Sequence, residues 1–148
     1  MPLVRTRLAV GLVSLALIAL ELTLMRLLSL RWWDHFAYMV ISVALLGFGA
    51  SGTALTLLRR RVLAHHRGWL AGFAVAFALS VPVSALLSRL VELDVAFLAW
   101  DLRQVGNVLL TELVMFVPFF LAGCTIGLAL MDRPERVSGH YAANLAGS

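Results

Sequence analysis

Apolar residues form four long runs along this chain, and most polar residues lie in the short segments between them. The hydrocarbon core of a bilayer is about 30 Å thick, and an α-helix crosses it with roughly 20 apolar residues. All four runs meet that length. They predict membrane-spanning helices at about residues 8–30, 36–58, 69–87 and 108–131. We therefore expect an all-α, polytopic transmembrane helix bundle that forms a single domain, residues 1–148.

Two other segments are not expected to span. Residues 89–104, RLVELDVAFLAWDLRQ, are too polar, but a helix there would gather its large apolar residues on one face. That pattern is typical of an interfacial helix on the membrane surface, and an ordered loop packed on the bundle is the alternative. A fifth apolar stretch starts near His140 and stops at Ser148, too soon to cross. We interpret it as the truncated start of a fifth helix in a fragment of a longer protein.

Composition excludes a soluble enzyme of ordinary type. Hydrophobic residues make up 61% of the chain and charged residues 14%, whereas a soluble domain is about 45–50% apolar and about 25% charged. The amino terminus resembles a secretory signal, since arginines precede an apolar core, but no small-residue cleavage site follows. We interpret it as an uncleaved first span. Trp32, Trp33, Trp69 and Trp100 all fall at span ends, where the membrane interface favours tryptophan.

The arginines predict the orientation. Eight of them would lie on one side of the membrane and three on the other. The eight are Arg5, Arg7, Arg59, Arg60, Arg61, Arg67, Arg133 and Arg136; the three are Arg31, Arg89 and Arg103. Because cytoplasmic segments carry the excess of arginine, we expect a multi-pass protein of the cell (inner) membrane with a cytoplasmic amino terminus. These positions at span ends indicate topology, and we expect no nucleic-acid partner.

A glycine motif in the second span imitates a dinucleotide-binding fingerprint. Gly47, Gly49 and Gly52 spell G-x-G-x-x-G, but that fingerprint also needs a carboxylate about 20 residues later. Residues 35–91 contain none. In a membrane, small residues let helices approach closely. We therefore expect Gly47, Gly49, Ser51 and Gly52 to serve helix packing, and we expect no cofactor.

The sequence offers no metal site. Cys124 is the single cysteine and lies inside an apolar run, so neither a disulfide nor a cysteine-based zinc site is available. His65 and His66 are adjacent in the arginine-rich segment between the second and third spans, with no carboxylate near them. We interpret both histidines as part of a solvated loop.

Three charged residues lie inside the predicted spans, where each costs on the order of 2–3 kcal/mol. They are Glu21 and Arg26 in the first span and Glu112 in the fourth. Arg26 and Glu112 come to similar depths, which predicts an ion pair between them and leaves Glu21 without an obvious partner. One interpretation is a functional polar site in the outer half of the bundle, formed by these three residues and His35. The other is a structural ion pair together with a protonated, hydrogen-bonded Glu21.

Three stretches resemble a known family. They are ELTLMRLLSLRWWDHFAYMVISVALLGFGASG (21–52), VPFFLAGCTIGLAL (117–130) and RVSGHYAANLAGS (136–148). All are similar to membrane-embedded spermidine synthase-like (polyamine aminopropyltransferase-like) proteins. The resemblance implies a helical membrane domain followed by a soluble Rossmann-type transferase domain, which this sequence lacks. It carries over Glu21, Arg26 and His35 as family-like positions and no catalytic residue. Asn144 stands where the family usually has an acid.

These observations leave three functional hypotheses. The leading one is the membrane domain of a spermidine synthase-like protein, which serves as an anchor and as a site for a small molecule such as a polyamine. The second is an accessory subunit whose helices pack against a larger membrane complex. The third is part of a transporter, which would need an inverted repeat that the sequence does not reveal. In each case we expect lipid and other membrane helices, or a missing soluble domain, as partners, and no catalysis by this segment alone.

Overall fold

The computed structural model describes residues 2–32, 35–90, 101–131, 142 and 144–147, and in this part of the chain it contains helices and no strand. The helices are α1 (Pro2–Trp32), α2 (His35–Leu57), α3 (Arg59–Ala64), α4 (His66–Leu90) and α5 (Leu102–Met131). Four of them are long and apolar enough to cross a membrane, over Leu8–Leu30, Tyr38–Leu57, His66–Ser88 and Leu102–Met131. The expected all-α, four-span fold is therefore confirmed.

The helices extend beyond the predicted spans at several ends. The arginine-rich segment expected as a loop contains the short helix α3, which begins after a bend at Leu58. Arginine, leucine and alanine all favour helix, which explains a helical turn there. Val62 is buried and holds α3 against the bundle. The proposed interfacial helix at 89–104 falls mainly on residues 91–100, which lie outside the described residues.

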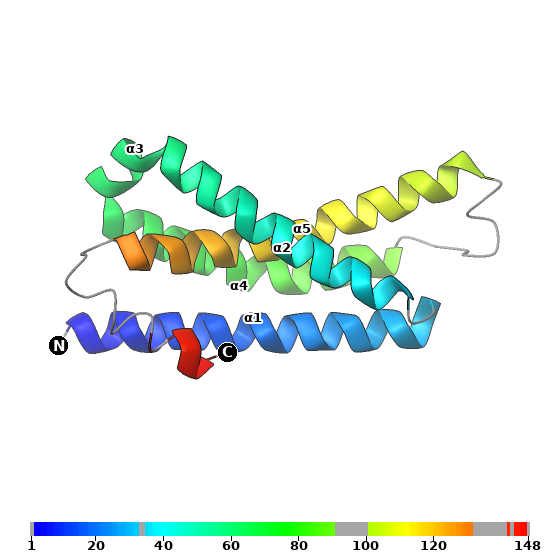
Figure 1. The fold of residues 1–148 in the computed structure, drawn as a ribbon, viewed down its shortest axis with the longest axis horizontal. Helices are drawn as coiled ribbons and strands as arrows, with labels where there is room; N and C mark the ends of the chain where they lie inside the picture. The colour runs from blue at the N-terminus through cyan, green and yellow to red at the C-terminus, as the bar shows by residue number, and fades with distance from the viewer. Residues whose placement is uncertain (1, 33–34, 91–100, 132–141, 143, 148) are drawn as a thin grey trace.

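Helix α5 forms the centre of the bundle. It packs against α1, α2 and α4, and its contact with α2 is the most extensive between any two helices (Figure 1). Within their most apolar windows, 56% of α5 is buried but only 11% of α4. The other faces of α1, α2 and α4 are therefore left for lipid or for partner helices.

Helices α2 and α5 run in the same direction and cross near the middle of both (Figure 1). At the crossing a Cβ atom on Gly47 would lie 2.8 Å from the Phe119 Cβ and 3.0 Å from the Phe120 backbone nitrogen. One turn further, a Cβ on Gly123 would overlap the Ser51 hydroxyl. Small residues at these two positions therefore let the two backbones approach, as expected for helices packed in lipid.

Two of the four predicted packing residues do not take part in this contact. Gly49 and Gly52 are exposed, and a Cβ on either would meet no other residue within 4 Å. The prediction that a neighbouring helix of this chain approaches Gly49 is therefore wrong. The reason is helical geometry, since residues two apart point about 200° away from each other. Gly47 and Ser51, four apart, share the face that meets α5.

The carboxyl-terminal segment returns to α1. Residues 144–147 are helical, and Gly147 lies against the Gly11 backbone and the Ser14 side chain. The Ser14 hydroxyl lies 2.6 Å from the Asn144 amide oxygen and 3.0 Å from the Val10 carbonyl. Figure 1 shows this segment beside the first half of α1. A small residue on each side again allows the close approach.

Candidate intramembrane pocket at Glu112

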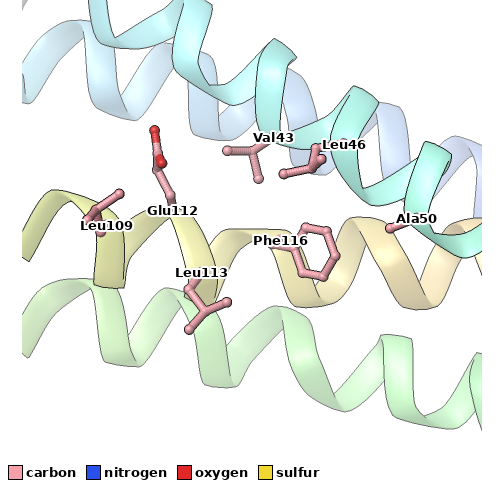
Figure 2. A pocket seen from close by; sticks show the side chains of 7 residues that line it. All are labelled: Val43, Leu46, Ala50, Leu109, Glu112, Leu113 and Phe116. Carbon is pink, nitrogen blue, oxygen red and sulfur yellow. The ribbon is translucent and has the colours of Figure 1, made fainter.

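A pocket opens between α2 and α5 on the side of the crossing nearer to the start of both helices (Figure 2). Its volume is about 380 Å³. The residues that line it are Val43, Leu46 and Ala50 from α2 and Leu109, Glu112, Leu113 and Phe116 from α5. Six of these seven residues are apolar, so Glu112 supplies the single ionisable group in the lining.

The Glu112 side chain extends from α5 toward α2, and Val43 lies to one side of it (Figure 2). Glu112 is partly exposed, and Leu46, Leu109 and Leu113 in the rim are each more than half exposed, so the pocket opens to the outside of the bundle. Among the described residues, Glu112 has no hydrogen bond or ion pair. A carboxylate in such apolar surroundings is favoured by a hydrogen-bond donor or a cation, and the described residues supply none.

The predicted ion pair between Arg26 and Glu112 is not formed in the described chain. Arg26 is exposed and lies on the face of α1 that also carries the exposed Leu22 and Leu30. Leu24 and Leu28, on the opposite face, are the residues that pack into the bundle. The arginine therefore points away from α5, and the two charges lie on different faces of the molecule.

The depths of the two charges nevertheless agree. Gly47 lies level with Phe119, so moving seven residues back along both parallel helices places Val40 level with Glu112. Helix α1 ends at Trp32 and α2 begins at His35, and the two helices run in opposite directions. Arg26 is six residues before the end of α1 and Val40 is five residues after the start of α2, so the two lie at nearly the same depth. At about 1.5 Å per residue, the two charged residues share one depth in the bundle. Two features keep them apart: Arg26 lies on the exposed face of α1, and the first half of α5 diverges from α1 (Figure 1).

Glu21 occupies a third environment. It is partly buried and follows the inward-facing stripe of α1, between Leu17 and Leu24. These two leucines belong to the main apolar core together with Val43 and Phe119. Among the described residues, Glu21 makes no hydrogen bond or ion pair. It therefore faces the bundle, while Glu112 faces the pocket between α2 and α5.

His35 begins α2, but its side chain lies outside the described residues. No hydrogen bond or ion pair joins Glu21, Arg26 and Glu112 in the described part of the chain. In addition, no group of three histidine, cysteine, aspartate or glutamate residues there could hold a metal ion. The local chemistry is that of a binding pocket with one carboxylate.

His66 has a role that sequence reasoning missed. Its Nε2 lies 3.1 Å from the Leu128 carbonyl oxygen, and the residue is partly buried, whereas a solvated loop was expected. Leu128 lies in the last turn of α5, where carbonyl groups have no partner within the helix. The imidazole N–H donates to one of them and ties the start of α4 to the end of α5. No spacing in the sequence pointed to this contact.

Gly123 and Gly127 were also missed, although a signal was present. They form a G-x-x-x-G pair within the apolar run of α5, the spacing that marks close helix contacts in membranes. Gly123 meets Ser51, and a Cβ on Gly127 would lie 2.8 Å from a terminal methyl of Leu55. Gly47, Ser51 and Leu55 thus face Phe119, Gly123 and Gly127 in register.

A comparison of the chain with models of known protein families, with curated proteins and with solved structures finds no match.

Proposed function

We propose that this chain is a membrane domain that binds a molecule with one protonated amine and an apolar body in the pocket between α2 and α5. The observation that carries this proposal is Glu112, an intramembrane carboxylate without a partner in the described chain, at the wall of an otherwise apolar pocket. The volume of about 380 Å³ lies in the range of ligand pockets, roughly 300–1,000 Å³. An ammonium group would satisfy the carboxylate, and leucine and phenylalanine would contact the rest.

The resemblance to spermidine synthase-like proteins supports the amine class, and we retain that family as a hypothesis for the origin of the domain. The pocket itself favours a single cationic end over a polyamine. A second ammonium group in the pocket would face Leu46, Leu113 or Phe116, and burying an unpaired charge there is costly. We therefore expect spermidine to bind more weakly than an amine with a single cationic end.

Native mass spectrometry of the chain in mild detergent tests this function. Dodecylamine, spermidine and the neutral dodecanol serve as probes. We expect dodecylamine adducts on the wild type at concentrations at which dodecanol gives none. Glu112→Gln should weaken dodecylamine binding about tenfold or more, because a hydrogen bond to a charged group contributes roughly 1.5–3 kcal/mol.

Glu21→Gln is the matched control, since it removes an intramembrane carboxylate that does not line the pocket. It should leave dodecylamine binding unchanged. Equal adducts of dodecanol and dodecylamine, or full binding by Glu112→Gln, would contradict an amine site at Glu112. Tight spermidine binding that depends on Glu112 would restore the polyamine hypothesis.

We further propose that the protein resides in the cell (inner) membrane with the α3 end cytoplasmic, which places the pocket in the outer half of the bilayer. The support is the excess of arginine at that end. Single cysteines at His65 and Leu102, both exposed and at opposite ends, test the orientation in a Cys124→Ser background. An impermeant thiol reagent added outside intact cells should label Leu102→Cys only. Labelling of His65→Cys alone would show that the protein has the opposite orientation in the membrane.

The exposed position of Arg26 favours a second candidate, an accessory subunit of a membrane complex. A cation inside an apolar helix face costs about 2.5–3.5 kcal/mol unless its side chain reaches the interface or meets an anion. A partner helix with a carboxylate at this depth would supply one. Copurification at fixed stoichiometry with another membrane protein, lost on Arg26→Leu, would support this candidate. An unchanged composition after Arg26→Leu would exclude Arg26 as the point of contact.

A further inference from the structure

The end of the bundle at α3 carries a cluster of positively charged residues. Four arginines lie within nine residues of sequence and all are exposed. They are Arg59, Arg60, Arg61 and Arg67, which we call the arginine corner. The first three belong to α3, and Arg67 belongs to the first turn of α4. His65, between the two helices, is exposed as well.

No carboxylate balances these charges within the adjoining helices, since α2, α3 and α4 contain no aspartate or glutamate. None of the four arginines has an ion pair in the described part of the chain. Four exposed guanidinium groups on adjoining helical turns repel one another, and anions from outside these helices would reduce that repulsion. The positive-inside bias accounts for the side of the membrane on which these arginines lie, but it supplies no counter-charge.

Apolar side chains surround the arginine corner. Leu57 is 81% exposed and Leu58 is 45% exposed, directly before Arg59. Trp69 is 43% exposed in the first turn of α4, and tryptophan is typical of the membrane interface. The corner therefore combines a cationic surface with an apolar one at the level where the helices leave the bilayer.

The corner is also held in place by packing. Val62 is 2% exposed and belongs to a core cluster with Leu55, Cys124 and Leu128, so α3 is fixed on α2 and α5. Residues two apart on a helix point about 200° from each other. Because Val62 points into the bundle, Arg60 points outward. The backbone that carries Arg59, Arg60 and Arg61 is therefore held in place on the bundle.

We propose that the arginine corner binds the phosphate headgroup of an anionic phospholipid from the leaflet at the α3 end, with its acyl chains against Leu57 and Leu58. Guanidinium groups match the geometry of phosphate oxygens and donate paired hydrogen bonds to them. Polybasic segments next to a membrane helix attract anionic lipids. The exposed leucines favour a lipid over a free phosphate, because they can contact acyl chains that inorganic phosphate lacks. This site is independent of the pocket at Glu112.

Native mass spectrometry of the chain in mild detergent, titrated with phosphatidylglycerol or phosphatidylcholine, tests the proposal. The wild type should bind phosphatidylglycerol at least about tenfold more tightly. Arg60→Gln should weaken that binding about fivefold, the fold-change that one interfacial arginine supplies. The triple variant Arg59→Gln/Arg60→Gln/Arg61→Gln should remove the preference. Arg103→Gln, an exposed arginine in the first turn of α5 at the other end, is the matched control and should keep it.

Thermal unfolding in detergent shows whether each variant is folded, and Arg60→Gln provides the readout if the triple variant is not, since its outward position leaves the Val62 contact intact. Equal binding of the two lipids by the wild type would overturn the proposal. So would a preference that survives Arg60→Gln undiminished. Release of phosphatidylglycerol by millimolar inorganic phosphate would show that the arginine corner binds free phosphate rather than a lipid.

Discussion

Helices α2 and α5 meet in two different ways along their length. At the crossing, Gly47 and Gly123 have no side chain, and the backbones of the two helices touch. Toward the start of both helices, from Val43, about one turn before Gly47, to Leu109, about three turns before Phe119, larger side chains line an open pocket of about 380 Å³. Figures 1 and 2 show the two regions on one pair of ribbons.

The difference shows how one helix pair can provide both stability and a binding pocket. In lipid the association of helices depends on close packing rather than on removal of apolar surface from water. The crossing supplies that packing and fixes the angle between the helices. Crossed helices move apart on both sides of the crossing point. Larger side chains therefore lie between them there, and a cavity forms where these side chains do not fill the space. We therefore expect substitutions at the crossing to change stability and substitutions in the pocket to change binding.

The largest effect should come from Gly47→Leu. Its Cβ would lie 2.8 Å from the Phe119 Cβ and 3.0 Å from a backbone nitrogen, so α5 must move. We expect a loss of about 1–3 kcal/mol or failure to fold. Gly49→Leu is the control, since the space around Gly49 is open, and it should change stability by less than about 0.5 kcal/mol. Thermal unfolding in detergent measures both, and equal losses would mean that the crossing does not lie at Gly47.

We expect a smaller loss of stability from a substitution at Gly123, and a second substitution should recover it. A Cβ there would overlap the Ser51 hydroxyl and lie 3.0 Å from the Ser51 Cβ. Gly123→Ala should therefore cost on the order of 1 kcal/mol by overpacking. Because the obstacle is a side chain, Ser51→Gly in the same chain should recover most of the loss. Denaturation of the wild type, the two single variants and the double variant gives the coupling free energy between residues 51 and 123. Strictly additive losses would show that these residues do not touch.

Much of the fold followed from the sequence, because lipid imposes a length on every span and places tryptophan and arginine at its ends. The site followed only in part. Counting residues gave similar depths for Arg26 and Glu112, but it could not give the rotation of α1 about its axis. The faces of that helix hardly differ in hydrophobicity, so its sequence does not show which face meets the bundle. The helical period alone could have separated Gly49 from Gly47.

The relation between Arg26 and Glu112 should produce the smallest effect on stability. Because Arg26 points away from α5, Arg26→Leu and Glu112→Leu should change the free energy of unfolding additively, with a coupling below about 0.5 kcal/mol. The double-mutant cycle in detergent measures that coupling. A coupling of several kcal/mol would restore an ion pair within the chain and would remove the free carboxylate on which the binding proposal rests.

Binding of dodecylamine to variants of both regions tests the division between crossing and pocket most directly. Ala50→Phe places a ring in the pocket, and Glu112→Gln removes its charge. Gly49→Leu lies next to Ala50 in sequence but outside the pocket. Titration by native mass spectrometry should show binding weakened about tenfold or more by the first two and unchanged by the third. Full affinity in both Ala50→Phe and Glu112→Gln would contradict the pocket as the binding site.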